Sequence, residues 1–266
     1  MTGLPIREVA KPWGREVLPA PFQAPPGEKI GEVWFEPPAA LPQLLVKYIF
    51  TSEALSVQVH PSDAQTLAKG LGRQGKEECW LVIDAEPGAV LGIGFDAPVT
   101  TKAMRAAALD GSIEKLMTWH PVQAGDFFYI PAGTVHAIGA GVSLIEVQQN
   151  SDITYRLYDY GRPRELHLDE GLAVAKGEPH DPALRRHVPR QGDVTLVEGP
   201  LFRLDRIEGA PDAAIAQRYG NRPLLIIPRK GDVRIVGEAI AVGGCGLAAS
   251  LADVEFGDLS LITQPC

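Results

Sequence analysis

Residues 125–136 read Gly-Asp-Phe-Phe-Tyr-Ile-Pro-Ala-Gly-Thr-Val-His, and this segment constrains the fold more than any other part of the chain. Residues 127–130 are aromatic or β-branched, which is typical of a strand. Pro131 presets its own φ angle and Gly133 can adopt a positive φ, so a tight turn is predicted to follow. The turn delivers the imidazole of His136 to a fixed place. Taken alone, His136 can also be read as a residue that only caps the turn.

A second segment, residues 55–60, alternates strictly between apolar and polar side chains. Alternation of this kind is typical of a strand with two different faces, and here it places Ser56, Gln58 and His60 on the polar face. Pro61 ends the strand because it cannot donate to a ladder of hydrogen bonds. Ser62 then suits the N-cap of a short helix over residues 64–70.

Further strands are predicted over residues 44–50, 75–84, 142–149 and 152–158. The first is apolar except for Lys47, and its apolar run predicts a strand buried on both faces. The charge of Lys47 would then need a partner or a ligand, unless its side chain reaches the surface. Alternation places Lys76, Glu78 and Trp80 on one face of the second strand. It likewise places Asp152, Thr154 and Arg156 together on the last one.

Four side chains from three of these strands form a candidate metal site: Gln58, His60, Glu78 and His136. Two imidazoles, a carboxylate and an amide oxygen suit Zn²⁺, although Mn²⁺, Co²⁺ and Fe²⁺ accept the same donors. Each residue also has a simpler reading on its own. Gln58 can be a surface residue of a strand, and Glu78 can pair with Lys76 or Lys47.

The rest of the chain divides by its pattern. Residues 100–119 carry apolar side chains at helical spacing, interrupted by Asp110-Gly111, and predict two short helices that could pack over the mouth of a barrel. Residues 161–192 are predicted to connect two domains and to contain a helix over 168–176. From residue 194, short strands over 196–207, 224–227, 232–236, 239–242 and 259–262 predict a second β domain. It contains no histidine.

Composition excludes several classes of protein. The chain has 266 residues, a formal charge of -8 and no tract rich in Lys and Arg, which argues against nucleic acid as a partner. Its three cysteines are widely scattered, which indicates neither a disulfide framework nor a thiolate metal site. We expect a reducing compartment, and with no apolar signal or membrane-spanning segment in the sequence we expect a cytoplasmic protein without membrane contacts.

The spacing Gly-x5-Pro-x-Gly-x2-His at residues 125–136 resembles the second signature of the cupin barrels, in which the histidine binds a metal; Ala140 stands where an Asn is common. The chain further resembles the type I mannose-6-phosphate isomerases, which are cupins. The resemblance covers about residues 8–170 and is carried by Lys-Pro-Trp-Gly at 11–14, Leu-Ser-Val-Gln-Val-His-Pro at 55–61, Gly-Lys-Glu-Glu-Cys-Trp at 75–80, Ile-Pro-Ala-Gly-Thr-Val-His-Ala at 130–137 and Gln-Asn-Ser-Asp-Ile-Thr-Tyr-Arg at 149–156.

This resemblance implies a mainly β fold: a cupin jelly-roll domain over residues 1–160, a connecting segment over 161–192, and a degenerate sandwich-like domain over 193–266. It implies that Gln58, His60, Glu78 and His136 bind the metal and that Arg156 is an active-site residue. Glu77 and Arg15 depart from the Thr and Gly usual in the family, and the helical insertion is short.

The implied reaction interconverts mannose 6-phosphate and fructose 6-phosphate through a cis-enediol. It needs groups that move a proton and hold negative charge, for which Lys76, Asp152 and Arg156 are candidates. The phosphate needs cations or donors, for which Lys47, Ser56 and Arg162 are further candidates. Two alternatives stay open, because cupins host unrelated functions: another metal-dependent enzyme such as a dioxygenase, and a sugar-binding regulator without catalysis.

Overall fold

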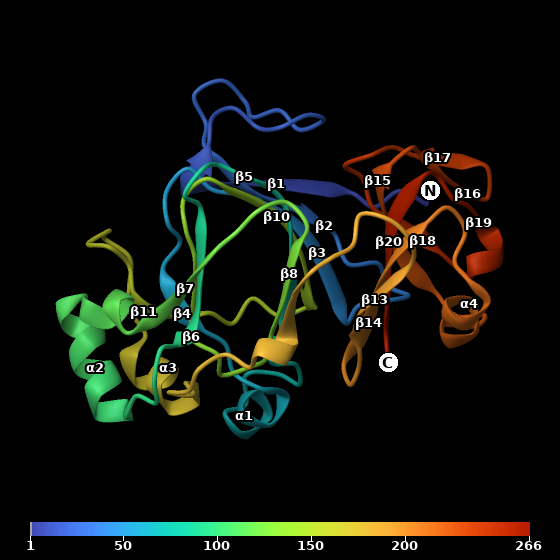
Figure 1. Ribbon diagram of the computed structural model, residues 1–266. Coiled ribbons are helices and arrows are strands. Elements are labelled where there is room, and N and C mark those ends of the chain that lie inside the picture. Colours follow the sequence, from blue (N-terminus) through green and yellow to red (C-terminus); the bar gives the residue numbers. More distant parts are fainter. Residues whose placement is uncertain (1) are drawn as a thin grey trace.

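Two antiparallel sheets face each other in the larger of two β bodies that make up the computed structural model, which describes residues 2–266 (Figure 1). The first sheet has seven strands, in the order β1 (Ile6–Arg15), β2 (Ile30–Phe35), β3 (Leu44–Phe50), β10 (Val142–Gln149), β5 (Glu78–Ala85), β8 (Asp126–Ile130) and β12 (Arg185–His187). The second has five, in the order β11 (Tyr155–Tyr158), β4 (Val57–Val59), β9 (His136–Ile138), β6 (Val90–Phe95) and β7 (Met117–Pro121). This is the predicted jelly-roll arrangement of a cupin.

Strands β3 and β10 lie at the centre of the seven-stranded sheet, and every residue of both is buried. The prediction of a doubly buried strand over 44–50 is therefore confirmed. Both faces of this sheet are covered because its inner face lines the interior of the jelly roll and its outer face packs on the smaller body.

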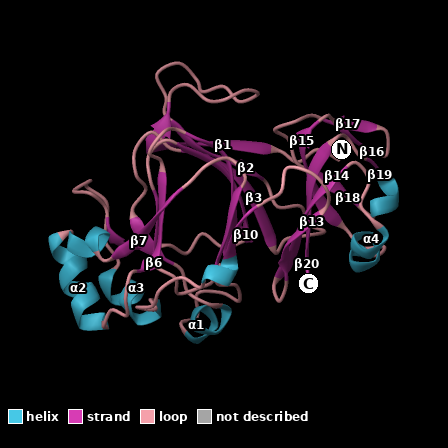
Figure 2. Ribbon diagram, in the orientation of Figure 1, coloured by secondary structure: helices cyan, strands magenta, loops and turns pink. Residues whose placement is uncertain are grey.

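Three α-helices flank the jelly roll (Figure 2). Helix α1 (Asp63–Ala68) begins at Ser62, which forms a capping box with Gln65 as the N-cap prediction requires. Helices α2 (Thr101–Asp110) and α3 (Leu168–Val174) cover the outer face of the five-stranded sheet and do not lie over a barrel mouth.

The prediction of two helices over residues 100–119 is wrong in its second half. Gly111 takes a φ of 79° and ends α2, as a left-handed C-terminal residue does. A single 3₁₀ turn, Ser112–Lys115, follows, and residues 117–121 form strand β7. Met117 has helical spacing to its predecessors, but it is buried as a strand residue opposite Phe95.

The smaller body is a β sandwich formed by the end of the chain. Its larger sheet has the order β13 (Val194–Glu198), β14 (Phe202–Glu208), β20 (Leu259–Pro265), β15 (Leu224–Lys230) and β18 (Gly246–Ala248); its smaller sheet has β17 (Glu238–Ile240), β16 (Val233–Ile235) and β19 (Val254–Glu255). Helix α4 (Ala213–Tyr219) packs on its core. The strand predicted over 196–207 is a hairpin, because the chain turns at residues 199–201 between β13 and β14.

The two bodies share one hydrophobic core. Phe127 and Tyr48 of the seven-stranded sheet belong to the same cluster of buried residues as Phe202 and Leu225 of the smaller body. The beginning of the chain also joins the smaller body, since the Leu4 amide donates to the Cys245 carbonyl at 2.8 Å. Residues 161–192, expected to connect two domains, contribute α3 and β12 to the jelly roll. The domain boundaries at 160 and 192 stay a prediction.

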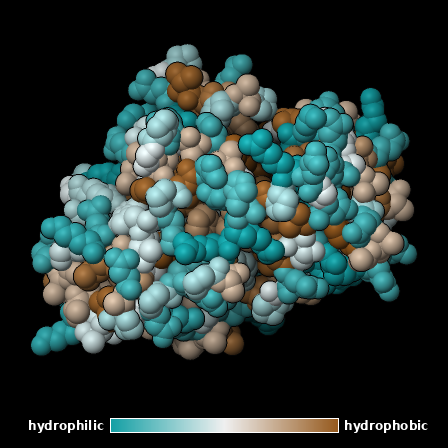
Figure 3. Space-filling view, viewed as in Figure 1, coloured by the Kyte–Doolittle hydropathy of each residue, from teal (hydrophilic) through white to brown (hydrophobic). Residues whose placement is uncertain are grey.

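The surface seen in Figure 3 is mostly hydrophilic, with hydrophobic side chains in small separate areas. Across residues 2–266, none of the helices has the length and apolar character needed to cross a membrane. All three cysteines are free thiols, two of them buried.

Candidate active site

Strand β4 places the polar residues of segment 55–60 inside the jelly roll. Val57 and Val59 are fully buried on the outer side, against α2 and α3, so Gln58 points inward as the alternation predicts. The register sets Gln58 opposite His136 on β9 and opposite Arg156 on β11. Three predicted site residues from distant parts of the chain therefore stand side by side on one sheet.

The facing sheet supplies the remaining polar groups. Its register sets Lys47 of β3 opposite Glu146 of β10, and Glu146 opposite Trp80 of β5. Glu146 accepts a hydrogen bond from Trp80 Nε1 at 3.0 Å and lies 3.2 Å from Lys47 Nζ. Glu78, at the start of β5, points into the space between the sheets and is completely buried.

His60, Glu78 and His136 come together with their ligand atoms all within 4.8 Å of one another. Glu78 Oε1 lies 3.3 Å from His136 Nε2, and Glu78 Oε2 lies 3.8 Å from His60 Nε2. Donor atoms about 2.1 Å from one tetrahedral ion are roughly 3.4 Å apart, so this spacing suits a metal.

Two further observations test whether the residues fit a metal. Each histidine has its Nδ1 2.9 Å from a backbone carbonyl, of Ile153 for His60 and of Thr134 for His136, so Nε2 is the nitrogen that could bind a metal. Both oxygens of Glu78 are buried and neither accepts a regular hydrogen bond, although Lys76 forms an ion pair with Oε2. The Nε2 atoms face Glu78, and their present contacts are with Lys76 Nζ at 3.2 Å for His60 and with Gln58 Nε2 at 3.3 Å for His136. A buried carboxylate facing two imidazole nitrogens fits a divalent metal ion that would replace these contacts.

Gln58 completes this donor set after a simple rotation. Its Nε2 lies 3.3 Å from His136 Nε2, and its Oε1 accepts from Ser56 Oγ at 3.5 Å. The two ends of an amide are assigned from hydrogen bonding, and a half turn presents Oε1 to the three other donors. Ser56 then accepts from Nε2, because a hydroxyl both donates and accepts.

Two glycines hold the strands that carry the metal donors. Gly133 has a φ of 85°, as predicted for this turn, and its amide donates to the His60 carbonyl at 2.9 Å. A Cβ on Gly75 would lie 2.2 Å from the Pro61 carbonyl oxygen, so only glycine permits β5 to start this close to α1. The amide of Gly75 donates to Asp63 at 2.7 Å.

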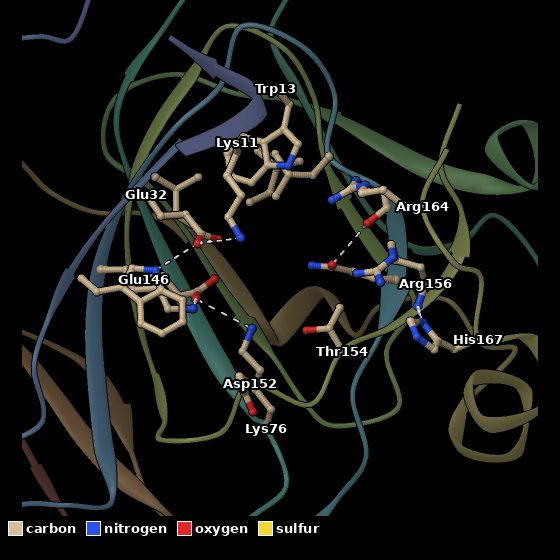
Figure 4. Close-up of a pocket in the computed structure, with 17 residues that line it drawn as sticks. Lys11, Trp13, Glu32, Lys76, Glu146, Asp152, Thr154, Arg156, Arg164 and His167 are labelled. Atoms are coloured by element: carbon tan, nitrogen blue, oxygen red, sulfur yellow. Dashed lines mark hydrogen bonds and ion pairs between the residues drawn. The ribbon is translucent and has the colours of Figure 1, made fainter. Parts of the chain in front are cut away.

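A cavity of about 400 Å³ opens beside the metal donors (Figure 4). Arg156, Arg164 and His167 line one wall. Lys11, Glu32 and Glu146 lie on the opposite wall (Figure 4), and the lining also includes Trp13, Trp34 and Lys47. Gln58 and Lys76 also line the cavity.

Burial sets the charge of the metal donors. It lowers the pKa of His136 to about 4 and, with nearby Lys76, holds the pKa of His60 well below its usual value, so both imidazoles are neutral at pH 7. Burial and Glu146 raise the pKa of Glu78 to about 7. A bound cation would reverse that shift, because an opposite charge favours the carboxylate.

Lys76 and Glu146 are both charged despite their burial. Burial alone would lower the pKa of Lys76, but Glu146 and Glu78 outweigh it and raise that pKa. Burial would likewise raise the pKa of Glu146, but Lys76 and Lys47 outweigh it and lower that pKa to about 2. The inner wall therefore offers a fixed ammonium group beside the metal donors.

Arg156 carries the one guanidinium of the cavity wall that has no carboxylate partner among residues 2–266. Its Nε donates to the Glu165 carbonyl at 2.9 Å, and its backbone amide donates to His167 Nδ1 at 3.2 Å. Arg164, in contrast, forms two hydrogen bonds of 2.6 Å with Asp159. Burial and nearby Arg164 lower the pKa of Arg156.

Nearly all residues predicted for the site line this region, and Arg162 is the exception. Lys47, Ser56, Lys76, Asp152 and Arg156 line the cavity, and His60, Glu78 and His136 lie behind Gln58. Arg162 lies outside the lining, because its guanidinium binds Asp159 and the Ala54 carbonyl. It therefore supports the loop that carries Arg164.

Sequence reasoning missed several lining residues: Lys11, Glu32, Trp34, Glu146, Thr154, Arg164 and His167. Alternation on 142–149 places Glu146 on one face with Gln148, which is a signal that could have identified it. Lys11 and Glu32, which pair at 3.2 Å, gave no such signal because their place depends on the register of β1 and β2.

No family model matches the sequence. Among curated proteins, the mannose-6-phosphate isomerase of Streptococcus mutans is 42% identical over 168 residues, which are 60% of this chain and 52% of that protein. The mannose-6-phosphate isomerase ManA of Bacillus subtilis is 38% identical over 197 residues, 69% of this chain and 60% of that protein. The chain thus spans between half and two thirds of the length of these relatives.

Solved structures give a match along the whole chain. A mannose 6-phosphate isomerase from Bacillus subtilis has a TM-score of 0.78 and 25% identity over 98% of both chains. A zinc-bound mannose 6-phosphate isomerase has a TM-score of 0.72 at 14% identity, over 100% of this chain and 99% of that one, which is a likeness of fold alone. By sequence and by fold, the chain belongs to the mannose-6-phosphate isomerase family.

Proposed function

We propose that this chain is a metal-dependent aldose–ketose isomerase that interconverts mannose 6-phosphate and fructose 6-phosphate. The proposal rests on one observation: a candidate metal site and a guanidinium without an ion-pair partner in the described part of the chain lie at the same cavity, which has a volume of about 400 Å³. Gln58 lines this cavity with His60, Glu78 and His136 behind it, and the guanidinium of Arg156, which has no ion pair within residues 2–266, lies on its wall. A phosphosugar needs both of these features, and the family relationship supports the same substrate class.

Gln58, His60, Glu78 and His136 are the proposed metal ligands, and Zn²⁺ is the proposed ion. Two imidazoles and a carboxylate with an amide oxygen suit Zn²⁺, and a related isomerase binds zinc. Mn²⁺ and Co²⁺ accept the same donors. When bound, such an ion acts as a Lewis acid that polarises oxygens of the sugar.

The residues around the donors have separate parts in the proposed proton transfer. Asp152 lines the cavity, and it forms no ion pair within residues 2–266. This carboxylate would take the proton from C2 of mannose 6-phosphate and return it to C1, through a cis-enediol, while O1 gains one proton and O2 loses one. Lys76 and Arg156 would hold the negative charge that develops on the sugar oxygens. Glu146 would keep Lys76 protonated at Nζ.

The phosphate needs cationic groups at some distance from the metal donors. Arg164 uses Nε and Nη2 for Asp159 and keeps Nη1 for a ligand. We assign the phosphate to Arg164, with Ser56 and Lys47 as polar contacts for the rest of the sugar. Arg164 thus takes the part that sequence reasoning gave to Arg162.

A dioxygenase is the second candidate, since two histidines and one carboxylate are also the ligand set of many Fe²⁺ oxygenases. The neighbourhood favours the isomerase, because Lys76, Arg156 and Arg164 supply cations that a phosphosugar uses and dioxygen does not. A regulator that binds sugar without catalysis would keep the binding groups but show no turnover.

Incubation of the purified protein with mannose 6-phosphate, followed by direct measurement of fructose 6-phosphate, tests the proposal. We expect conversion in both directions towards one equilibrium ratio. Binding of the phosphosugar without conversion, at full occupancy by any of the three metals, would favour the regulator. Oxygen consumption with Fe²⁺ would favour the dioxygenase.

A further inference from the structure

A second cavity, of about 300 Å³, lies between the two β bodies. Leu81 and Ile83 on the outer side of β5 line it from the jelly roll, and Leu259 and Leu261 of β20 line it from the smaller body. The segment that joins the bodies, at residues 187–190, forms its rim. Interfaces between domains are frequent places for small-molecule sites, and this volume is at the lower end of their usual range.

Three arginines line this cavity: Arg190, Arg206 and Arg229. The described chain, residues 2–266, contributes no Asp or Glu to the lining. This is a local reversal of charge, because the whole chain carries a formal charge of -8. A cleft lined by charges of one sign and by apolar walls has a strong electrostatic potential, which attracts a ligand of the opposite charge.

The guanidinium of Arg229 is not neutralised by the protein. Its Nη1 donates to the neutral hydroxyl of Tyr48 at 3.2 Å, and its central carbon lies 5.8 Å from the Tyr48 ring centroid. It forms no ion pair with any residue of the described part of the chain. A half-buried cation with a single neutral partner keeps most of its hydrogen-bonding capacity for a ligand.

Arg206 adds a second uncompensated charge at greater depth. It is only 7% exposed, and its two terminal nitrogens donate to the backbone carbonyls of Gly192 and Arg190. Carbonyl oxygens satisfy the hydrogen bonds of this guanidinium, but they do not cancel its charge. A buried cation without a counter-ion is costly, and an anion in the cavity would lower that cost.

We propose that this cavity binds a small organic anion with an apolar body, such as a carboxylate or phosphate on an aromatic or aliphatic group. The anionic group would lie against Arg229, with Arg206 behind it, and the apolar body against Leu81, Ile83 and Leu259. The ligand would touch both β bodies and would also touch β5, the strand that begins with Glu78. The site would thus serve an effector of the proposed enzyme; its existence does not depend on the proposed reaction.

The fluorescent dye 8-anilinonaphthalene-1-sulfonate tests this site, because it is an aromatic anion. N-phenyl-1-naphthylamine, which has nearly the same rings and no charge, is the matched probe. We expect the native protein to bind the sulfonate at one site per chain and to bind the uncharged amine at least about tenfold more weakly, as for the loss of a charge-assisted hydrogen bond. Equal affinity for both dyes, or no saturable binding of the sulfonate, would overturn the proposal.

Variants locate the dye within the molecule. Arg229→Gln should weaken sulfonate binding at least about tenfold, and Arg229→Lys should weaken it less because it keeps a charge. Arg234→Gln changes an exposed arginine that donates to the Gly237 carbonyl, and Arg156→Ala changes the other cavity, so both should bind the sulfonate like the native protein. Weakening by Arg156→Ala in place of Arg229→Gln would put the dye in the first cavity and overturn the proposal.

Discussion

Arg156 differs from the other cations of the first cavity because none of the carboxylates within residues 2–266 forms an ion pair with it. Lys11 pairs with Glu32 at 3.2 Å, Lys47 pairs with Glu146 at 3.2 Å, and Arg164 is held by Asp159. Each of these partners reduces the charge that its cation can offer to a ligand. The free guanidinium of Arg156 is therefore the group best placed to hold charge that develops during a reaction.

Replacing Arg156 by alanine should separate metal binding from turnover. We expect Arg156→Ala to retain one metal per chain and to lose about 10²-fold or more in kcat, as when one preorganised donor is removed from an active site. Arg105→Ala, which removes an exposed arginine paired with Asp169, is the matched control and should keep both properties. Metal content and initial rate measured on the same samples give the answer; full activity of Arg156→Ala would disprove the role.

At the level of elements, a histidine connects an edge strand of the five-stranded sheet of the jelly roll to an edge strand of its seven-stranded sheet. His120 on β7 and Arg185 on β12 are hydrogen-bonded, with the imidazole Nδ1 as the acceptor. The two strands lie at the ends of different sheets, so this contact closes one side of the jelly roll. Burial, with Arg185 and His180 nearby, lowers the pKa of His120 to about 4.

The contact predicts a specific dependence of stability on pH. The pKa of His120 is about 4 in the folded state and 6.5 in the unfolded state. Between these two pH values, the unfolded chain therefore binds more protons at this residue than the folded chain does. Folding stability should therefore fall as pH drops from about 6.5 towards 4, by roughly 1 to 2 kcal/mol from this group once partial solvent screening is allowed for. His120→Gln should remove that part of the loss.

Denaturant unfolding at pH 7 and pH 4.5 measures this effect, with chelator present so that metal release does not contribute. The native protein should lose more stability between the two values than His120→Gln. Equal losses in the two proteins would show that His120 does not stay neutral in the folded state.

The elements predicted correctly are those whose pattern is local. The turn at Pro131–Gly133 and the alternation around Gln58 depend on neighbouring residues only, and both are confirmed. The run from 196 to 207 is apolar enough for one strand, and only the turn at 199–201 divides it. Arg162 and Arg164 look equivalent in sequence, because the Asp159 and Ala54 contacts that distinguish them come from folding.

At the scale of the whole molecule, the two bodies are expected to unfold together. Phe202 of the smaller body is fully buried in the shared core, with its ring 6.1 Å from that of Tyr129. All four tryptophans, Trp13, Trp34, Trp80 and Trp119, belong to the jelly roll. Their fluorescence therefore reports on the body that does not contain Phe202.

Phe202→Ala should destabilise the jelly roll although it changes the smaller body. We expect a loss of about 3 to 5 kcal/mol in the free energy of unfolding, seen equally by tryptophan fluorescence and by far-ultraviolet circular dichroism. Val17→Ala, at a position that is 83% exposed, should change it by less than about 0.5 kcal/mol. An unchanged tryptophan transition in Phe202→Ala would mean that the bodies unfold independently.

The role of the smaller body could not be predicted from its sequence. Its strands show where apolar residues lie, but not that those of β14 and β15 cover the outer face of the seven-stranded sheet. That pairing depends on contacts between residues far apart in the chain, such as Tyr48 with Arg229. The proposed metal donors could be named from the sequence because motifs around each of them resemble one family, and their role as ligands stays a prediction.

The most direct test of the central claim is a titration of the purified protein with a chelator, in which bound metal and the rate of mannose 6-phosphate conversion are measured on the same samples. We predict that rate and metal content fall together, that Zn²⁺, Mn²⁺ or Co²⁺ restores the rate, and that Glu78→Ala shows neither metal nor turnover. Undiminished conversion by metal-free protein would contradict the claim.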